Sequence, residues 1–421
     1  SALKKLSSQI NEPTLIFCSS PASAKRVADI LMGIEPRSDS KYLNDAANWI
    51  DANFHPDWQF GRALRHGIGI HHGRIPRALA QYVVRSFNNG RLKYLVCTST
   101  LIEGVNTAAK NVVIYDNRIA TSKFDYFTFN NIRGRSGRMF RHFVGHVYLF
   151  YEPPPESLWE LEIPFFSQTE ETPETLLIQM DKDDLTDRSV TRIEKFERQD
   201  ILSIQTLRGN KFIDPDDQIA LAQEILDDLR RYHSLLEWQG FPGNFDQLRA
   251  ICNLIFSHFS AGTQMGARTG SQLAFRISYL AQTKSIKSLI DQEIQNPKSP
   301  GSNDEKVETI LNFVRHWATF HFPRLLMAID LIQKDVFTRN QLIPGDYKAY
   351  AESVENLFLS PALVALDEYG IPLQLAIKLS SKLDLETSLD EALSIIKRIN
   401  VNEYELHPFE REILEDVTQF I

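Results

Sequence analysis

Residues 14–33, TLIFCSSPASAKRVADILMG, join a short apolar run to an amphipathic one. The run TLIFCS is too short for a helix, whereas residues 21–33 show helical spacing, with Pro21 in the first turn and Gly33 at the end. The alternation then recurs along the first third of the chain. Further apolar runs predict strands at residues 67–72, 92–98, 111–116 and 145–150. Strands that alternate with helices predict an α/β fold with a parallel sheet.

Two breaks in this alternation predict the domain boundaries. Residues 34–65 interrupt it and are expected to form a partly helical insertion. Three consecutive prolines at 153–155 end the first domain, because they cannot continue a strand or a helix. Long helical periods dominate from about residue 214 onward. We therefore predict an α/β domain at 1–152, an acidic crossover segment at 153–213, and a mostly α-helical accessory region at 214–421 that could hold two subdomains.

The composition is that of an ordinary globular protein. Of the 421 residues 43% are hydrophobic and 24% are charged, which excludes a disordered or low-complexity chain. No apolar run approaches the roughly 18 residues of a membrane span, so no membrane association is expected. The three cysteines, Cys18, Cys97 and Cys252, form no CxxC pair. We therefore expect a reducing, cytoplasmic location and no metal site.

Charge is distributed unevenly along the chain. Residues 1–152 contain 20 Lys and Arg against 11 Asp and Glu, and the remainder contains 26 against 43. The basic first third could face the phosphates of DNA or RNA, since polyanion binding depends on a local patch rather than on the net charge of −8. The acidic remainder favours an interdomain surface or a protein partner over extensive wrapping by nucleic acid.

The most informative stretch is FNNIRGRSGRMFR, Phe129–Arg141, between two predicted strands. Arg135 and Arg138 are three residues apart, so both would project from one face of a helix. Two neighbouring guanidinium groups repel each other unless an anion bridges them, and a polyphosphate suits their forked donors. On this stretch alone, a surface arginine turn or an RG-type nucleic-acid loop remains an alternative.

A second stretch, CTSTLIEGVNTAAKNVV at Cys97–Val113, follows the predicted strand 92–98. Its hydroxyl groups and exposed amides could bind phosphate oxygens. Gly104 would let a ligand approach the backbone, and Asn106 could reach a ribose hydroxyl. An ordinary strand-to-loop turn has the same composition and stays open as an alternative.

The other two stretches place polar residues after the strands at 14–19 and 67–72. His71 and His72 point to opposite faces of a strand, so one is expected in the core and the other beside Gly73 and Arg74, where it could meet a phosphate backbone. The hydroxyls of Ser19-Ser20 could hold a phosphate, or could cap the helix that begins at Pro21.

In this order the four stretches resemble the second, C-terminal RecA-like motor domain of superfamily-two helicases. TLIFCSS is similar to motif IV, GIGIHHG to the strand-end motif that follows, TSTLIEGVN to motif V and NIRGRSGR to motif VI. The double histidine, the insertion before it and the T-x-T-x-x-x-G-V-N pattern resemble the superkiller-like DExH branch. The resemblance covers residues 14–151. Asn131 stands where the family usually has glutamine, and Ser99 where an acidic residue is common.

The resemblance implies roles for individual residues. Arg135 and Arg138 would be catalytic arginines that reach ATP phosphates, and Gly104 and Asn106 would lie near the γ-phosphate and ribose. A second set would hold the backbone of a nucleic acid, most simply a single strand of DNA or RNA. This set comprises Ser19, Ser20, His72, Gly73, Arg74, Thr98 and Thr100.

Two elements of a complete motor are missing from the sequence. The first is a phosphate loop, which contains Gly-Lys, a dipeptide that this sequence lacks. The second is an acidic D-E-x-H/D strand for Mg²⁺ and water, since the candidate Asp390-Glu391 follows Thr387-Ser388 rather than an apolar strand. We therefore expect the C-terminal half of an ATP-dependent helicase or translocase, a nucleoside-triphosphate hydrolase. A first motor domain outside this sequence would bind most of the ATP and Mg²⁺, and this chain alone should be inactive. The alternative is a non-catalytic nucleic-acid-binding or scaffold protein.

Overall fold

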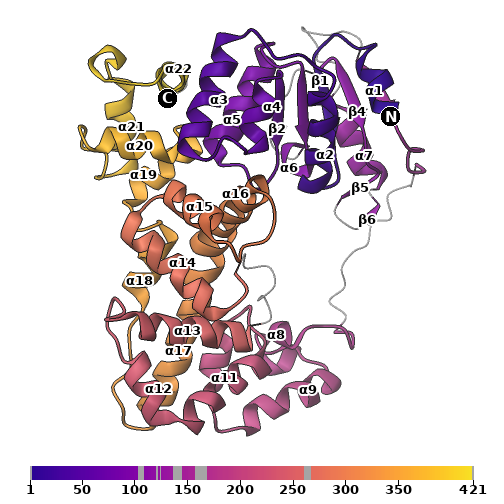
Figure 1. Cartoon of the computed structure of the whole chain (residues 1–421). Coiled ribbons are helices and arrows are strands. Elements are labelled where there is room, and N and C mark those ends of the chain that lie inside the picture. The colour runs from indigo at the N-terminus through magenta and orange to yellow at the C-terminus, as the bar shows by residue number, and fades with distance from the viewer. Residues whose placement is uncertain are drawn as a thin grey trace. The chain divides into compact units, whose positions relative to one another are not determined.

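The computed structural model describes residues 2–102, 109–119, 122–123, 125–135, 145–156, 168–259 and 267–419 (Figure 1). Contacts divide the chain into two compact units. Unit 1 comprises Ser1–Trp159, Ile286–Leu311 and Ser360–Ile421, and unit 2 comprises Glu160–Ser285 and Asn312–Leu359. Residues beyond 285 thus contribute to both units. The predicted boundaries at 152 and 213 follow the order of the chain and stay a prediction.

A five-stranded parallel sheet forms the centre of unit 1. Its order is β2-β3-β1-β4-β7. The strands are β1 (Thr14–Phe17), β2 (Ile68–His71), β3 (Tyr94–Cys97), β4 (Asn111–Ile114) and β7 (His146–Leu149). All residues of β1 to β4 are buried, as expected for apolar runs in a sheet covered by helices. The predicted α/β fold, with a RecA-like parallel sheet domain and a helical remainder, is confirmed.

Helices precede and connect these strands. They are α1 (Ala2–Ser7), α2 (Pro21–Met32), α3 (Lys41–Asn53), α4 (Gln59–Leu64), α5 (Arg77–Asn88), α6 (Ser99–Ile102) and α7 (Tyr126–Arg133), and a small antiparallel pair, β5 (Arg118–Ile119) and β6 (Ser122–Lys123), precedes α7. Helices α3 and α4 lie in the predicted insertion. Helix α2 begins as the sequence predicts, with Ser20 as the N-cap and Pro21 in the first turn.

Segments from the second half of the chain pack onto this domain within unit 1. They contain α15 (Ile286–Gln295), α16 (Asn303–Asn312), α19 (Pro361–Ala365), η4 (Leu366–Tyr369), α20 (Leu373–Ser380), α21 (Leu389–Lys397), η5 (Val401–Glu403) and α22 (Pro408–Thr418). Both tryptophans of the insertion are buried against them. Trp49 donates to Glu410 Oε1 at 3.0 Å, and Trp58 donates to Glu308 Oε1 at 2.9 Å. The acidic end of the chain thereby supplies acceptors to the basic α/β domain.

Helices are the main elements of unit 2 in its described residues, and loops and one isolated bridge between Gln239 and Asp346 join them. Its elements are α8 (Glu174–Leu177), η1 (Lys182–Asp184), α9 (Asp187–Arg198), α10 (Ile204–Gly209), α11 (Pro215–Asp227), α12 (Leu229–Leu236), α13 (Phe245–His258), α14 (Gly270–Thr283), the π-helix η3 (Phe313–His321), α17 (Phe322–Arg339) and α18 (Lys348–Glu355). Within the parts of the chain that the structure covers, every helix is too short or too polar to cross a membrane.

Candidate functional site

The strand ends that carry the predicted site residues lie along one edge of the sheet. In the parallel register Phe17 pairs with both Cys97 and Ile114, and His71 also pairs with Cys97. The residues that follow these strands therefore emerge side by side at the carboxyl edge. Ligand sites of open α/β sheets form outside this edge. The parallel sheet thus brings together three of the four stretches quoted above.

A carboxylate organises the turn after β1. Asp116, two residues beyond β4, accepts hydrogen bonds from Ser19 N at 2.8 Å and from Ser19 Oγ at 3.0 Å. Ser23 Oγ donates to the same carboxylate oxygen. Ser20 Oγ accepts from Ser23 N at 3.2 Å and caps α2. Both predicted serines are therefore at the edge, and both hydroxyls already have intramolecular partners.

The ends of β2 and β3 meet through Thr98, Thr100 and Gly73. Thr98 N donates to His71 O at 3.2 Å, and the Thr98 and Thr100 hydroxyl oxygens are 3.2 Å apart. Gly73 is close to Thr100, because a Cβ at position 73 would lie 3.7 Å from Thr100 Cγ2. Thr98 is buried and Thr100 is exposed. A ligand at this edge can therefore contact the Thr100 hydroxyl directly.

His72 and Arg74 form the outer corner of this edge. His72 is 6% exposed, and its Nδ1 accepts from Arg74 N at 3.3 Å. Its Nε2 lies 4.0 Å from Glu308 Oε1. Burial raises the pKa of Glu308, while the Trp58 hydrogen bond and the nearby Arg74 charge oppose that rise. Arg74 is exposed and His72 is buried, so solvent reaches Arg74 rather than His72.

Arg135 follows the end of α7 and is half-buried. Burial raises the pKa of the Cys97 thiol, and the positive charge of Arg135 opposes this rise. The charge of Arg135 therefore acts on the end of β3, and its catalytic role stays a prediction. The other three predicted nucleotide-binding residues, Arg138, Gly104 and Asn106, lie outside the described residues.

Sequence reasoning missed three acidic residues at this edge, namely Asp116, Glu308 and Asp367. Asp116 ends the run NVVIYD, so its position after a strand was a usable signal. Asp367 accepts from the backbone N–H groups of Arg77 at 3.1 Å and Ala78 at 3.2 Å, at the start of α5. Glu308 and Asp367 come from helices far along the chain, and no local pattern links them to the sheet.

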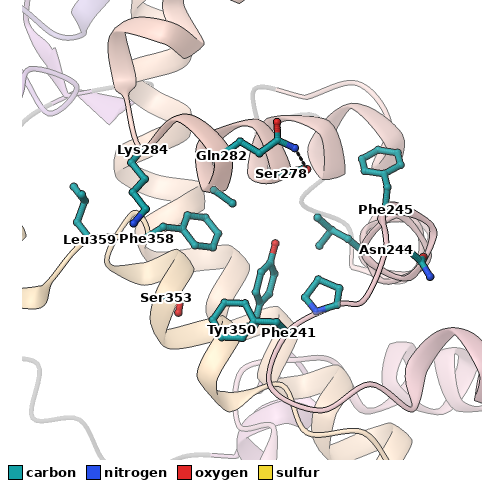
Figure 2. Close-up of a pocket in the computed structure, with 13 residues that line it drawn as sticks. Phe241, Asn244, Phe245, Ser278, Gln282, Lys284, Tyr350, Ser353, Phe358 and Leu359 are labelled. Atoms are coloured by element: carbon teal, nitrogen blue, oxygen red, sulfur yellow. Dashed lines mark hydrogen bonds between the residues drawn. The ribbon is translucent and has the colours of Figure 1, made fainter.

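Unit 2 contains a separate cavity of about 670 Å³, drawn in Figure 2. Phe241 and Tyr350 meet edge to face with their ring centroids 5.6 Å apart, and Phe241 is 53% exposed. Gln282 Nε2 and Ser278 Oγ, 3.4 Å apart, add polar groups on the wall formed by α14. The cavity thus offers aromatic faces beside a few hydrogen-bonding groups, a composition typical of small-molecule sites.

Comparison with known proteins identifies the class of the α/β domain. Residues 48–140 match the family described as "Helicase conserved C-terminal domain". Residues 48–140 of the α/β domain are therefore similar to helicase C-terminal domains. The resemblance to DExH-type helicases drawn from the sequence motifs is confirmed.

Three individual proteins are also similar to this chain. The chain is 32% identical over 402 residues to "Anti-bacteriophage protein B" of Escherichia coli K12, a match that covers 92% of this chain and 54% of that protein. It is 30% identical over 129 residues to "ATP-dependent DNA helicase Hel308" of Thermoplasma volcanium, covering 30% of this chain and 18% of that protein. It is also 30% identical over 153 residues to "DExH-box ATP-dependent RNA helicase DExH11" of Arabidopsis thaliana, covering 32% and 11%. The chain thus spans about half the length of the first relative and less of the others.

Proposed function

We propose that this chain is the C-terminal part of an ATP-dependent helicase or translocase that acts on DNA or RNA. The observation that carries the proposal is the five-stranded parallel sheet, whose carboxyl edge gathers three of the four motif-like stretches next to one another. Arg135 and Arg138 stabilise charge on the ATP phosphates, and Gly104 and Asn106 approach the γ-phosphate and ribose. An arginine in such a position contributes about 10³–10⁵ in rate in GTPases.

The nucleic-acid backbone is held along the same edge. The exposed Arg74 and Thr100 make the side-chain contacts, with Gly73 allowing close approach of the backbone. Ser19, Ser20, His72 and Thr98 hold this edge in shape through their hydrogen bonds. Contacts of this kind fix a strand's position without reading its sequence, which suits a motor that must move along it.

Hydrolysis requires a second motor domain. The sequence has no Gly-Lys dipeptide and hence no phosphate loop, so ATP and Mg²⁺ are bound mainly by the partner domain. We expect the 421-residue chain alone to show no ATPase activity above background, with or without nucleic acid. ATP hydrolysis by the purified chain would contradict this division of roles.

The decisive experiment joins the chain to a first motor domain from the complete protein and compares Arg138→Ala with Arg138→Lys. The alanine variant should lower the ATPase kcat about 10³-fold and keep nucleic-acid binding. The lysine variant keeps the charge and loses the bidentate fork, so its activity should fall between the two. Unchanged hydrolysis in Arg138→Ala would refute the assignment. Absence of hydrolysis in the joined wild-type protein would favour the non-catalytic scaffold.

A role in defence against bacteriophage is favoured by the match to "Anti-bacteriophage protein B", which extends over 92% of this chain. We propose that the complete protein restricts phage growth. Bacteria that express it should plate phage less efficiently than bacteria that express the Arg138→Ala form. Equal plating on the two strains would argue against this role without bearing on the ATPase assignment.

A further inference from the structure

A polar cavity of about 680 Å³ lies at the amino edge of the sheet in unit 1, opposite the edge that carries the motifs. Its walls come from the end of α2, from the segment before α3, from α3 and the loop that follows it, and from α4 with the residues that lead into β2. Four basic side chains line it, with two carboxylates among them. The basic residues are Arg37, Arg62, Arg65 and His66, and the acidic ones are Asp29 and Asp51.

Two hydrogen bonds assemble the basic side of this cavity. Ser38 N donates to Arg65 O at 2.7 Å, and His66 Nδ1 lies 2.7 Å from Glu35 O. These contacts tie the segment 35–38 to the residues that precede β2. They thereby place Arg37 beside Arg65, although the two are 28 positions apart in the sequence.

Both carboxylates in the cavity are engaged by neighbouring side chains. Asp51 pairs with Arg65, with 2.6 Å between Oδ2 and Nη2. Asp29 Oδ1 accepts from Gln59 Nε2 at 2.7 Å. By contrast, the guanidinium groups of Arg37 and Arg62 make no hydrogen bond or ion pair with any residue that the structure describes. The cavity thus retains two exposed cations without an ion-pair partner, while Asp29, whose hydrogen-bond donor is the neutral amide of Gln59, keeps its negative charge.

We propose that this cavity binds a phosphate group, with Arg37 and Arg62 as its direct ligands. Two forked, permanently charged groups facing one polar hollow can each make bidentate hydrogen bonds to phosphate oxygens. Arg65, held in place by Asp51, forms the third side of the site. The phosphate comes from the backbone of a nucleic-acid strand or from a free phosphate compound. The site requires neither ATP hydrolysis nor any residue of the carboxyl edge, so it is independent of the function proposed above.

The test uses the 421-residue chain with the double substitution Arg37→Ala/Arg62→Ala. Binding of a fluorescent 12-nucleotide single strand is followed by anisotropy, and binding of inorganic phosphate and pyrophosphate by calorimetry. Arg398→Ala is the matched control, because Arg398 is also an exposed arginine of unit 1 and lies at the end of α21. Circular dichroism and thermal melting verify that each variant is folded, and the conservative Arg62→Gln provides a second, milder variant.

We expect the double variant to bind at least one of these ligands about tenfold more weakly or worse, while Arg398→Ala binds as the wild type does. If the strand is the ligand, the slope of log K against log salt should also become shallower by about 1.4, since two phosphate contacts are lost. Loss confined to the strand assigns the site to a nucleic-acid backbone, and loss for phosphate or pyrophosphate alone assigns it to a free phosphate compound. Unchanged binding of all three ligands by folded variants would overturn the proposal.

Discussion

The charged side chains at the two edges of the sheet in unit 1 differ in whether they have partners within the fold. At the carboxyl edge, carboxylates accept hydrogen bonds from neighbouring backbone and side-chain groups, as Asp116 does from Ser19 and Asp367 does from the start of α5. At the amino edge, Arg37 and Arg62 have no acidic partner in the described structure. Asp116 and Asp367 at the motif-bearing edge thus have hydrogen-bond donors within the fold, whereas Arg37 and Arg62 at the opposite edge have no described partner.

This difference determines how a phosphate would bind at each edge. A phosphate at the carboxyl edge must compete with Asp116 for the Ser19 donors, or bind beside them through Arg74 and Thr100. A phosphate at the amino edge meets two guanidinium groups that have no described partner, beside the carboxylates of Asp29 and Asp51, which are held by Gln59 and Arg65. Hydrogen bonds that are already formed stabilise the fold, whereas unpaired cations contribute little to stability and are available for binding.

The largest expected effect that separates the two edges is on stability. Asp116→Ala leaves the Ser19 N–H and two serine hydroxyls without their acceptor, and should lower the free energy of unfolding by about 2–3 kcal/mol. Arg62→Ala removes an exposed side chain without a partner, and should change it by less than about 0.5 kcal/mol. Urea unfolding of the wild type and both variants under one set of conditions measures the difference.

Asp116→Asn is the control for this comparison, because its amide oxygen still accepts hydrogen bonds and its volume is nearly unchanged. It should lose less stability than Asp116→Ala. Similar unfolding midpoints for Asp116→Ala and Arg62→Ala would break the contrast between the two edges.

The fold of the α/β domain could be predicted from sequence because its signals are local. Each of the five predicted strands contains one strand of the sheet, and the predicted insertion contains α3 and α4. The Ser20-Pro21 pair marks the start of α2 through a cap that spans four residues. These features depend on short-range periodicity and capping, which a single sequence contains in full.

The surroundings of the site could not be predicted, because they depend on contacts across hundreds of residues. Glu308 is 236 positions from His72, and Asp367 is 290 positions from Arg77. No spacing rule connects such pairs. The sequence correctly excluded Asp390-Glu391 as a motif, since the two residues begin α21 behind the Ser388 cap. It could not indicate that Asp367 would cap α5 instead.

Removal of the Asp367 cap at the start of α5 should have an intermediate effect on stability. Asp367→Ala removes the carboxylate that accepts from the Arg77 and Ala78 backbone N–H groups, and should destabilise unit 1 by about 1 kcal/mol. Asp367→Asn retains an oxygen acceptor and should recover part of this loss. Hydrogen exchange at the first turn of α5 measures the effect locally. Unchanged protection there in Asp367→Ala would show that the cap contributes nothing to the carboxyl edge.

The smallest expected effect is on the pH dependence of stability. Two carboxylates of α16, those of Glu305 and Glu308, should contribute to it with opposite signs. Burial raises the pKa of Glu308, whereas the Ser302 backbone N–H lowers the pKa of the exposed Glu305. Folding therefore favours protonated Glu308, so its contribution to stability is present below its unfolded pKa and is lost as the pH rises through its folded pKa. Glu305 contributes above its unfolded pKa, and its contribution is lost as the pH falls through its lowered folded pKa.

Glutamine at either position removes the titration and keeps the shape, so the two variants serve as each other's control. Relative to the wild type, the Tm of Glu308→Gln should rise between about pH 4 and pH 8, and the Tm of Glu305→Gln should fall over the same range. Glutamine at position 308 can still accept from Trp58 Nε1, so its gain reflects the buried charge rather than a lost hydrogen bond. If both variants followed the same pH trend, Glu308 would behave as a solvated carboxylate.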